Sequence, residues 1–203
     1  MKAIVLLNGE PYNGVIDDSD AYVYCCDGAF DWAKGKVRID ETLGDFDSLD
    51  YIPDPPPKEI YPSEKDMTDG EIAILRAINV GADRIEIYGG GGKREDHFLG
   101  NLHLLYAALK RGAKAALVTN YTRIIAEEGR VEIIGCKGKT VSVVPLGGTA
   151  HIMESEGFYY PLDNLDLVYG STRGISNVVI SDKASFVTDG AVLVIINHRE
   201  EEL

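Results

Sequence analysis

Short, mostly continuous apolar runs recur in the first part of the chain, and each run ends in polar residues or glycine. These runs lie at Ala3–Leu7, Ala21–Cys26, Ile85–Tyr88 and Ala115–Val118. Continuous apolar runs of this kind are typical of strands that are covered on both faces. The four runs therefore predict four buried strands.

The segments between these runs have helical spacing. Apolar residues recur at steps of three in Asp69–Val80, and at steps of three and four in His97–Arg111. Because strands and helices alternate, residues 1–122 are predicted to form an α/β domain with a largely parallel sheet. Ligands of such domains bind where the strands reach their carboxyl ends.

After Tyr121 the helical spacing disappears and short β-rich runs follow, separated by Gly, Asn and Asp. The pattern predicts a small all-β sandwich domain over residues 123–203, with a boundary within 120–128. The expected strands and turns are Val131–Ile134, Thr140–Pro145, Val178–Ile180 and Val192–Asn197, with turns at Gly147-Gly148 and Asp189-Gly190.

Composition limits the function classes. The net charge of −13 argues against a nucleic-acid partner, which would be bound through clustered Lys and Arg. No apolar run approaches the roughly 20 residues of a membrane span, and Lys2–Leu7 is interpreted as a strand rather than a signal peptide. Three cysteines give neither a metal-ligand spacing nor an even disulfide framework, which favours a reducing cytoplasm and structural roles for Cys25 and Cys26.

The acidic turn Gly44-Asp45-Phe46-Asp47-Ser48 is the sharpest local feature. Its two carboxylates, two residues apart, share one face of an extended chain. Carboxylates this close repel unless a cation neutralises them, and a hard divalent ion such as Mg²⁺ prefers oxygen ligands. Taken alone, the turn is better explained as a solvated acidic loop, which accounts for most Asp pairs in arbitrary sequences.

A second acidic group, Asp66-Met67-Thr68-Asp69, immediately precedes a predicted helix. Thr68 and Asp69 are residue types that cap helix N-termini, so capping explains part of the motif. A cap does not require both Asp66 and Asp69. If this helix begins near Asp45, the combined carboxylates form a site for magnesium and a polyphosphate.

The glycine-rich segment Gly89–Gly92 follows a predicted strand, and Lys93, Arg94 and His97 come next. Glycines let backbone amides approach phosphate, and Arg94 or Lys93 can complete the cradle. The segment lacks the spacing of a Walker A loop, and a flexible surface hairpin is the alternative.

Asp27 follows the strand Ala21–Cys26, where an α/β site is expected. Its carboxylate is a candidate for orienting a substrate hydroxyl or for contributing to a metal site. Capping of a short helix near Ala29 explains it equally well. Trp32 is interpreted as a core or interface residue.

In this order, the four features resemble the thiamine pyrophosphokinase family. Residues 44–48 match its Gly-Asp-Phe-Asp-Ser motif, and Asp27-Gly28-Ala29 is similar to its Asp-Gly-Gly-Ala motif with one glycine fewer. Residues 66–69 resemble its Asp-x-x-Thr-Asp element, one residue shorter. Residues 91–97 resemble its Gly-Gly-Arg-x-Asp-His element, with Lys93 where the family often has its second glycine. Ser155–Leu162 and Gly174–Asn177 extend the resemblance over nearly the whole chain.

The resemblance implies a thiamine diphosphokinase that transfers pyrophosphate from ATP to the hydroxyl of thiamine, with Mg²⁺ as cofactor. It also implies a homodimer with thiamine at the subunit interface. The implied catalytic residues are Asp27, Asp45, Asp47, Asp66 and Asp69, of which Asp45, Asp47 and Asp69 hold the metal. The implied ATP contacts are Gly91, Gly92, Arg94, Asp96, His97 and Asn101, and the implied thiamine contacts are Tyr160, Ser176 and Asn177.

Two alternatives remain open from the sequence. One is pyrophosphoryl transfer to another alcohol, such as the hydroxymethyl group of a pterin, although the β-rich C-terminal region argues against it. The other is a non-catalytic sensor of nucleotide or thiamine, although the retention of every proposed metal carboxylate disfavours it.

Overall fold

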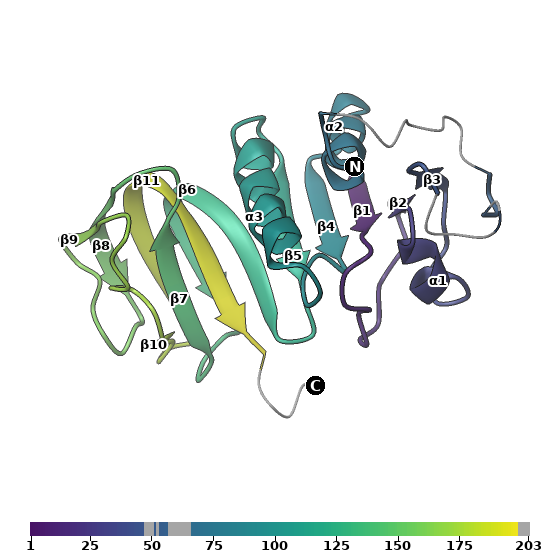
Figure 1. Cartoon of the computed structure of the whole chain (residues 1–203). Helices are drawn as coiled ribbons and strands as arrows, with labels where there is room; N and C mark the ends of the chain where they lie inside the picture. Colours follow the sequence, from purple (N-terminus) through teal and green to yellow (C-terminus); the bar gives the residue numbers. More distant parts are fainter. Residues whose placement is uncertain (47–50, 52, 57–65, 199–203) are drawn as a thin grey trace. The chain divides into compact units, whose positions relative to one another are not determined.

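The computed structural model describes residues 1–46, 51, 53–56 and 66–198. The chain divides into two compact units, Met1–Asn120 and Tyr121–Leu203 (Figure 1). The first unit combines helices with strands, and the second consists of strands and loops.

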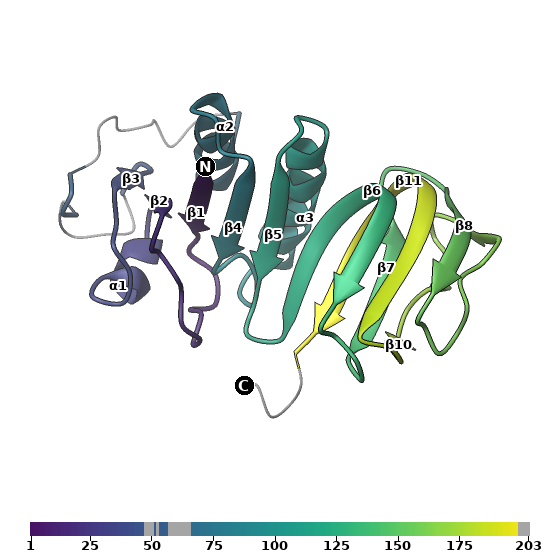
Figure 2. The same ribbon diagram turned by 180° about the vertical axis from the view of Figure 1, so that it is seen from behind.

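In the first unit the strands lie in the order β5-β4-β1-β2-β3 and pair in parallel. Helices α2 and α3 lie against the same face of this sheet (Figures 1 and 2). The elements are β1 Lys2–Leu6, β2 Ala21–Cys26, α1 Ala29–Ala33, β3 Glu41–Leu43, α2 Asp69–Asn79, β4 Arg84–Tyr88, α3 Glu95–Leu109 and β5 Lys114–Val118.

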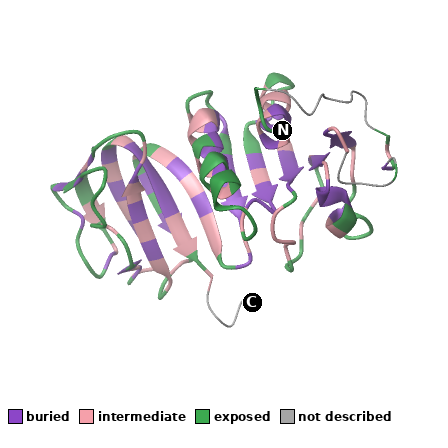
Figure 3. Cartoon of the chain, viewed as in Figure 1, coloured by how far each residue is buried: buried purple, intermediate pink, exposed green. Residues whose placement is uncertain are grey.

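The central strand β1 is flanked on both sides, by β2 and β4. Its residues Ala3 to Leu6 are fully buried, which explains the continuous apolar run (Figure 3). The four strands predicted in this unit are present, with ends that differ by one residue at most. Strand β3 was not predicted, because two of its three residues, Glu41 and Thr42, are polar although buried.

In the second unit the strands pair antiparallel around the long strand β11. The first half of β11 pairs with β8 and the second half with β7, while β6 pairs with both halves. Apolar side chains from these strands form one core, which includes Val143, Ile152 and Phe186. The elements are β6 Thr122–Ile134, β7 Thr140–Pro145, β8 Ala150–Glu156, β9 Leu165–Leu167, β10 Asn177–Val178 and β11 Lys183–Asn197.

The chain as a whole therefore contains both parallel and antiparallel pairings and few helices. The turn predicted at Asp189-Gly190 is wrong, because both residues lie inside β11 where its register shifts between Thr188 and Val192. The Thr188 hydroxyl donates to the Gly190 carbonyl at 2.9 Å, so the irregularity is closed locally. Strands β6 and β11 are longer than predicted, because residues 122–130 and 183–191, which mix apolar with polar and charged side chains, continue each strand.

No helix in the described part of the chain is long and apolar enough to cross a membrane.

Candidate active site

A pocket of about 690 Å³ lies in the first unit, where β1, β2, β3 and β4 end and α2 begins. The pocket brings together eight residues predicted from separate motifs: Asp27, Asp45, Asp66, Asp69, Gly91, Arg94, His97 and Asn101. Gly92 and Asp96 do not line it. Asp47 lies outside the described residues.

Close packing of Gly44 against Asp27 brings the first two acidic segments together. The Asp27 amide donates to the Leu43 carbonyl at 2.7 Å. A Cβ on Gly44 would lie 3.1 Å from the Asp27 Cβ, and Gly44 has a φ of 144°. A side chain at position 44 would thus strain its backbone and crowd Asp27, which explains why a glycine precedes Asp45.

The cap of α2 separates the roles of the third acidic segment. Thr68 is the N-cap, and its hydroxyl accepts a hydrogen bond from the Glu71 amide at 3.2 Å. Asp69 is the first residue of the helix and lines the pocket, where its Oδ1 atom is buried. Because Thr68 provides the cap, Asp69 is not needed for it. The Asp66 residue is exposed at the pocket edge.

The donor set of the pocket suits magnesium. Its acidic lining consists of aspartates, and Mg²⁺ prefers oxygen ligands. Within the described residues, no three His, Cys, Asp or Glu side chains are close enough to hold a metal ion by themselves. Asp47, the third predicted metal ligand, lies outside those residues.

Two backbone segments, which follow β1 and β4, lie side by side in the pocket lining. The Gly9 amide donates to the Gly89 carbonyl at 2.7 Å, and the Glu10 amide donates to the Gly91 carbonyl at 2.6 Å. A Cβ on Gly9 would lie 2.3 Å from the Gly89 oxygen, and a Cβ on Gly89 would lie 2.2 Å from the Leu7 oxygen. These glycines are required for the close approach, so the alternative of a free surface hairpin is wrong.

Two side chains donate hydrogen bonds to the backbone of these two segments. Asn101 on α3 is buried, and its Nδ2 donates to the Gly90 carbonyl at 2.8 Å. The indole of Trp32 donates to the Leu7 carbonyl at 3.1 Å and lies against Gly89. Trp32 is partly buried and packs against the backbone of Leu7 and Gly89, and its interpretation was that of a core or interface residue.

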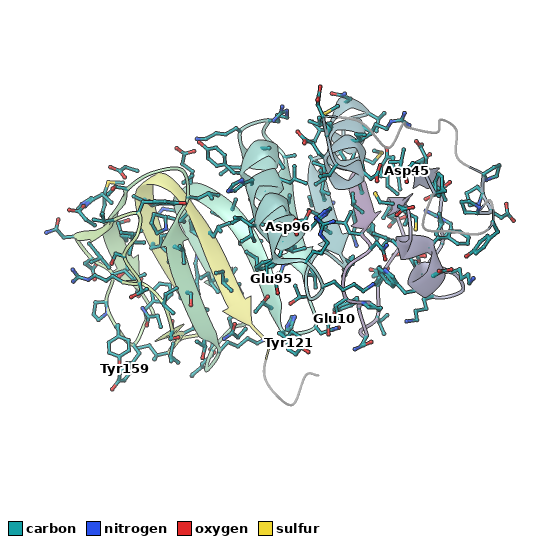
Figure 4. The ribbon with its side chains drawn as sticks, viewed as in Figure 1. Glu10, Asp45, Glu95, Asp96, Tyr121 and Tyr159 are labelled. Carbon is teal, nitrogen blue, oxygen red and sulfur yellow. The ribbon has the colours of Figure 1, made fainter. Side chains whose placement is uncertain are left out.

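Arg94 and Asp96 form an ion pair at the start of α3, where Figure 4 labels Asp96. Nε of Arg94 donates to Oδ1 of Asp96 at 3.1 Å, and Nη2 donates to Oδ2 at 2.6 Å. The Arg94 side chain and the His97 amide hold the pKa of Asp96 at about 2. Asp96 is therefore a partner of Arg94 and not part of the pocket lining.

Sequence reasoning missed several pocket residues. Asn8 carried the clearest signal, because it is the first polar residue after a buried apolar run. The others became evident only from packing. The residues that line the pocket without having been predicted for it are Leu7, Asn8, Gly9, Cys26, Met67, Thr68 and Gly70.

Cys25 is buried and does not line the pocket. Burial, followed by the negative charge of Asp27, raises the pKa of its thiol to about 12. The thiol is therefore protonated at neutral pH, in agreement with a structural role.

The predicted thiamine contacts lie close together in the second unit. Asn177 is buried, its Oδ1 accepts from the Tyr160 amide at 3.0 Å and its Nδ2 donates to the Tyr160 carbonyl at 2.7 Å. Tyr160 itself is 60% exposed and stacks edge-on against Tyr159, with ring centroids 4.8 Å apart. Ser176 is exposed, and its amide donates to the Ser142 hydroxyl at 3.0 Å.

Two family models match the chain over most of its length. Residues 15–117 match the thiamin pyrophosphokinase catalytic domain, and residues 123–193 match the thiamin pyrophosphokinase vitamin B1 binding domain. The thiamine pyrophosphokinase of Bacillus subtilis is 31% identical over 210 residues, which cover 97% of this chain and 98% of that protein. The chain belongs to the thiamin pyrophosphokinase family.

Solved structures of thiamin pyrophosphokinases have the same fold. The Bacillus subtilis crystal structure has a TM-score of 0.85 at 27% identity and covers 98% of this chain and 100% of that one. The structure from Geobacillus thermodenitrificans has a TM-score of 0.82 at 26% identity, with both chains fully covered. The yeast thiamin pyrophosphokinase, at 16% identity and a TM-score of 0.73, shows the fold alone and covers 100% of this chain and 87% of that one.

Proposed function

We propose that this chain transfers a pyrophosphate group from ATP to the hydroxyl of thiamine, giving thiamine diphosphate and AMP. One observation supports this most directly. Asp27, Asp45, Asp66 and Asp69 come from three separate segments and line the same pocket as the glycine-rich loop. Such a pocket offers oxygen ligands for a metal on one side and backbone beside cationic side chains on another.

The proposed chemistry is attack of the thiamine hydroxyl on the β-phosphorus of ATP. Asp45 and Asp69, with Asp47, would hold Mg²⁺, and Asp66 assists at the pocket edge. When bound, the ion supplies charge neutralisation to the polyphosphate. Asp27, held next to Gly44, orients the attacking hydroxyl. Positioning of the two substrates does most of the remaining work, because phosphoryl-type transfer requires little covalent participation by the protein.

The nucleotide side of the pocket is formed by the glycine loop. Gly91, Arg94, His97 and Asn101 line the pocket and are proposed ATP contacts, with Gly92 in the same loop. Asn101 acts on the loop backbone through Gly90. Asp96 acts indirectly, because it holds Arg94.

The second unit supplies the proposed thiamine contacts. Tyr160 presents an exposed aromatic ring, which suits the cationic thiazolium of thiamine through cation–π attraction. Asn177 holds the Tyr160 backbone, so its proposed role is to position that ring. Ser176 lies next to Asn177 and is proposed as a polar contact.

We further propose that the enzyme is a cytoplasmic homodimer with thiamine bound at the subunit interface. The exposed pair Tyr159 and Tyr160 supports such an interface. Free cysteines among the described residues suit a reducing compartment. A strict monomer in light scattering at assay concentration would contradict the interface, and recovery of the protein outside the cytoplasm on cell fractionation would contradict the location.

The activity is tested by incubating the protein with ATP, Mg²⁺ and thiamine and following AMP. Thiamine-dependent AMP is expected. AMP only with a pterin alcohol would select the other acceptor, and no AMP with either alcohol would favour a sensor. The metal assignment is tested with Asp45→Asn, which should lower kcat by roughly 100-fold, as loss of a charge-stabilising group does. Asp20→Asn is the matched control, because Asp20 is an exposed aspartate outside the pocket lining.

A further inference from the structure

The pocket has an acidic lining and little positive charge to receive a polyphosphate. Among the described residues, four aspartates line it, and the Lys and Arg residues of the lining are Lys93 and Arg94. A bound metal neutralises part of the phosphate charge, and the rest requires a cation of the protein. The question is which of these two neighbouring side chains provides it.

The guanidinium group of Arg94 is already paired with a carboxylate of the protein. It makes two hydrogen bonds to the Asp96 carboxylate, and this pairing lowers the pKa of Asp96 and raises the pKa of Arg94. A carboxylate held at a pKa of about 2 is ionised at neutral pH, so the pair persists there. The positive charge of Arg94 is therefore largely compensated by its own partner.

Lys93 differs from Arg94 in this respect. Within residues 1–46, 51, 53–56 and 66–198, its ammonium group makes no ion pair and no hydrogen bond. The backbone just before it is nevertheless fixed. Gly92 has a φ of 83°, and a Cβ there would lie 2.5 Å from the Cβ of Glu10. Lys93 thus lines the pocket, follows a glycine that packs against Glu10, and carries a charge without a partner among those residues.

We propose that Lys93, rather than Arg94, is the principal protein cation that binds the polyphosphate of ATP. The inference rests on the proposed function. An ammonium group on a flexible stem acts as a point charge and can follow phosphate oxygens as they move during transfer. Arg94, which is paired with Asp96, is then a secondary contact of ATP.

The test compares Lys93→Ala, Lys93→Arg, Arg94→Ala and Lys36→Ala for MgATP binding by isothermal titration calorimetry. Lys36 is an exposed lysine of the same unit that does not line the pocket. Lys93→Ala is expected to raise the Kd of MgATP by about 10-fold or more, the usual effect of losing a hydrogen bond to a charged group. Lys93→Arg should recover most of that loss, and Lys36→Ala should change nothing.

A steady-state assay supplies a second readout. Lys93→Ala should raise KM for ATP and leave KM for thiamine unchanged. An unaltered Kd of MgATP in Lys93→Ala would overturn the inference. It would also be overturned if Arg94→Ala, with an intact circular dichroism spectrum, weakened MgATP binding more than Lys93→Ala. If the unaltered chain makes no thiamine-dependent AMP, the proposed function fails, while the calorimetry still decides the role of Lys93.

Discussion

Glu41 on β3 and Arg76 on α2 form an ion pair that joins two acidic segments of the pocket. Strand β3 leads into Asp45, and α2 begins at Asp69. The Glu41 side chain is only 6% exposed, and the Tyr22 hydroxyl also donates to it, at 3.1 Å. The ion pair therefore holds β3 against α2, although neither Glu41 nor Arg76 lines the pocket.

Arg76→Met should destabilise the protein because it leaves the Glu41 carboxylate buried without its cation. The expected loss is about 3 kcal/mol in the free energy of unfolding, measured by urea denaturation. Arg130→Met is the control, since Arg130 pairs with Glu154 at an exposed site and should cost less than about 1 kcal/mol. Equal losses in the two variants would show that the buried pair does not brace the pocket.

Gly89→Ala tests the close approach of Gly89 to the Leu7 backbone. The added Cβ would lie 2.2 Å from the Leu7 oxygen in a backbone with a φ of 70°, so both stability and AMP formation should fall. Gly112→Ala has a similar φ of 79° with open space around it, and it isolates the backbone strain, roughly 1–2 kcal/mol. If Gly89→Ala loses no more than Gly112→Ala in thermal unfolding, the close approach is not essential.

The Arg94–Asp96 pair makes a prediction for pH. An NMR titration should place the midpoint of Asp96 at about 2, and Arg94→Gln should move it up toward the ordinary value of 3.8. Because the folded pKa is lowered, the contribution of this pair to stability is present above pH 3.8 and is lost as the pH falls through about 2. A midpoint that does not respond to Arg94→Gln would contradict the pairing.

Cys25 should resist alkylation in the folded protein. Its pKa of about 12 leaves almost no thiolate at pH 8, and its side chain is buried. Iodoacetamide at pH 8, followed by mass spectrometry, should modify the partly exposed Cys136 first and Cys25 only after denaturation. Modification of Cys25 at the rate of Cys136 would show that β2 opens readily.

The sequence predicted the buried strands and the two long helices well, because continuous apolar runs and helical spacing are local signals. Strand β3 escaped prediction because Glu41 is stabilised by Arg76, a contact between residues far apart in the chain. Strand β9 is also only three residues long, and no local sequence pattern predicts its pairing with β8.

The candidate site could be predicted in part for the same reason. Asp27, Asp45 and Asp69 were recognisable from local motifs, and the structure brings them to one pocket. The different situations of Lys93 and Arg94 could not be read from the sequence, since both are cations in one loop. Only the geometry separates them, because Asp96 engages one and leaves the other.

The close packing of the Leu7–Glu10 segment against the Gly89–Gly92 segment has a consequence for redesign. Its shape is specified by main-chain atoms and by the lack of side chains at Gly9 and Gly89, so amino-acid exchange has almost no means of adjusting it gradually. Variation that retunes substrate preference must instead accumulate at lining positions that carry side chains, such as Asn8 and Met67. Libraries that hold Gly9 and Gly89 constant and vary those lining positions should retain far more folded members than libraries that vary the two glycines.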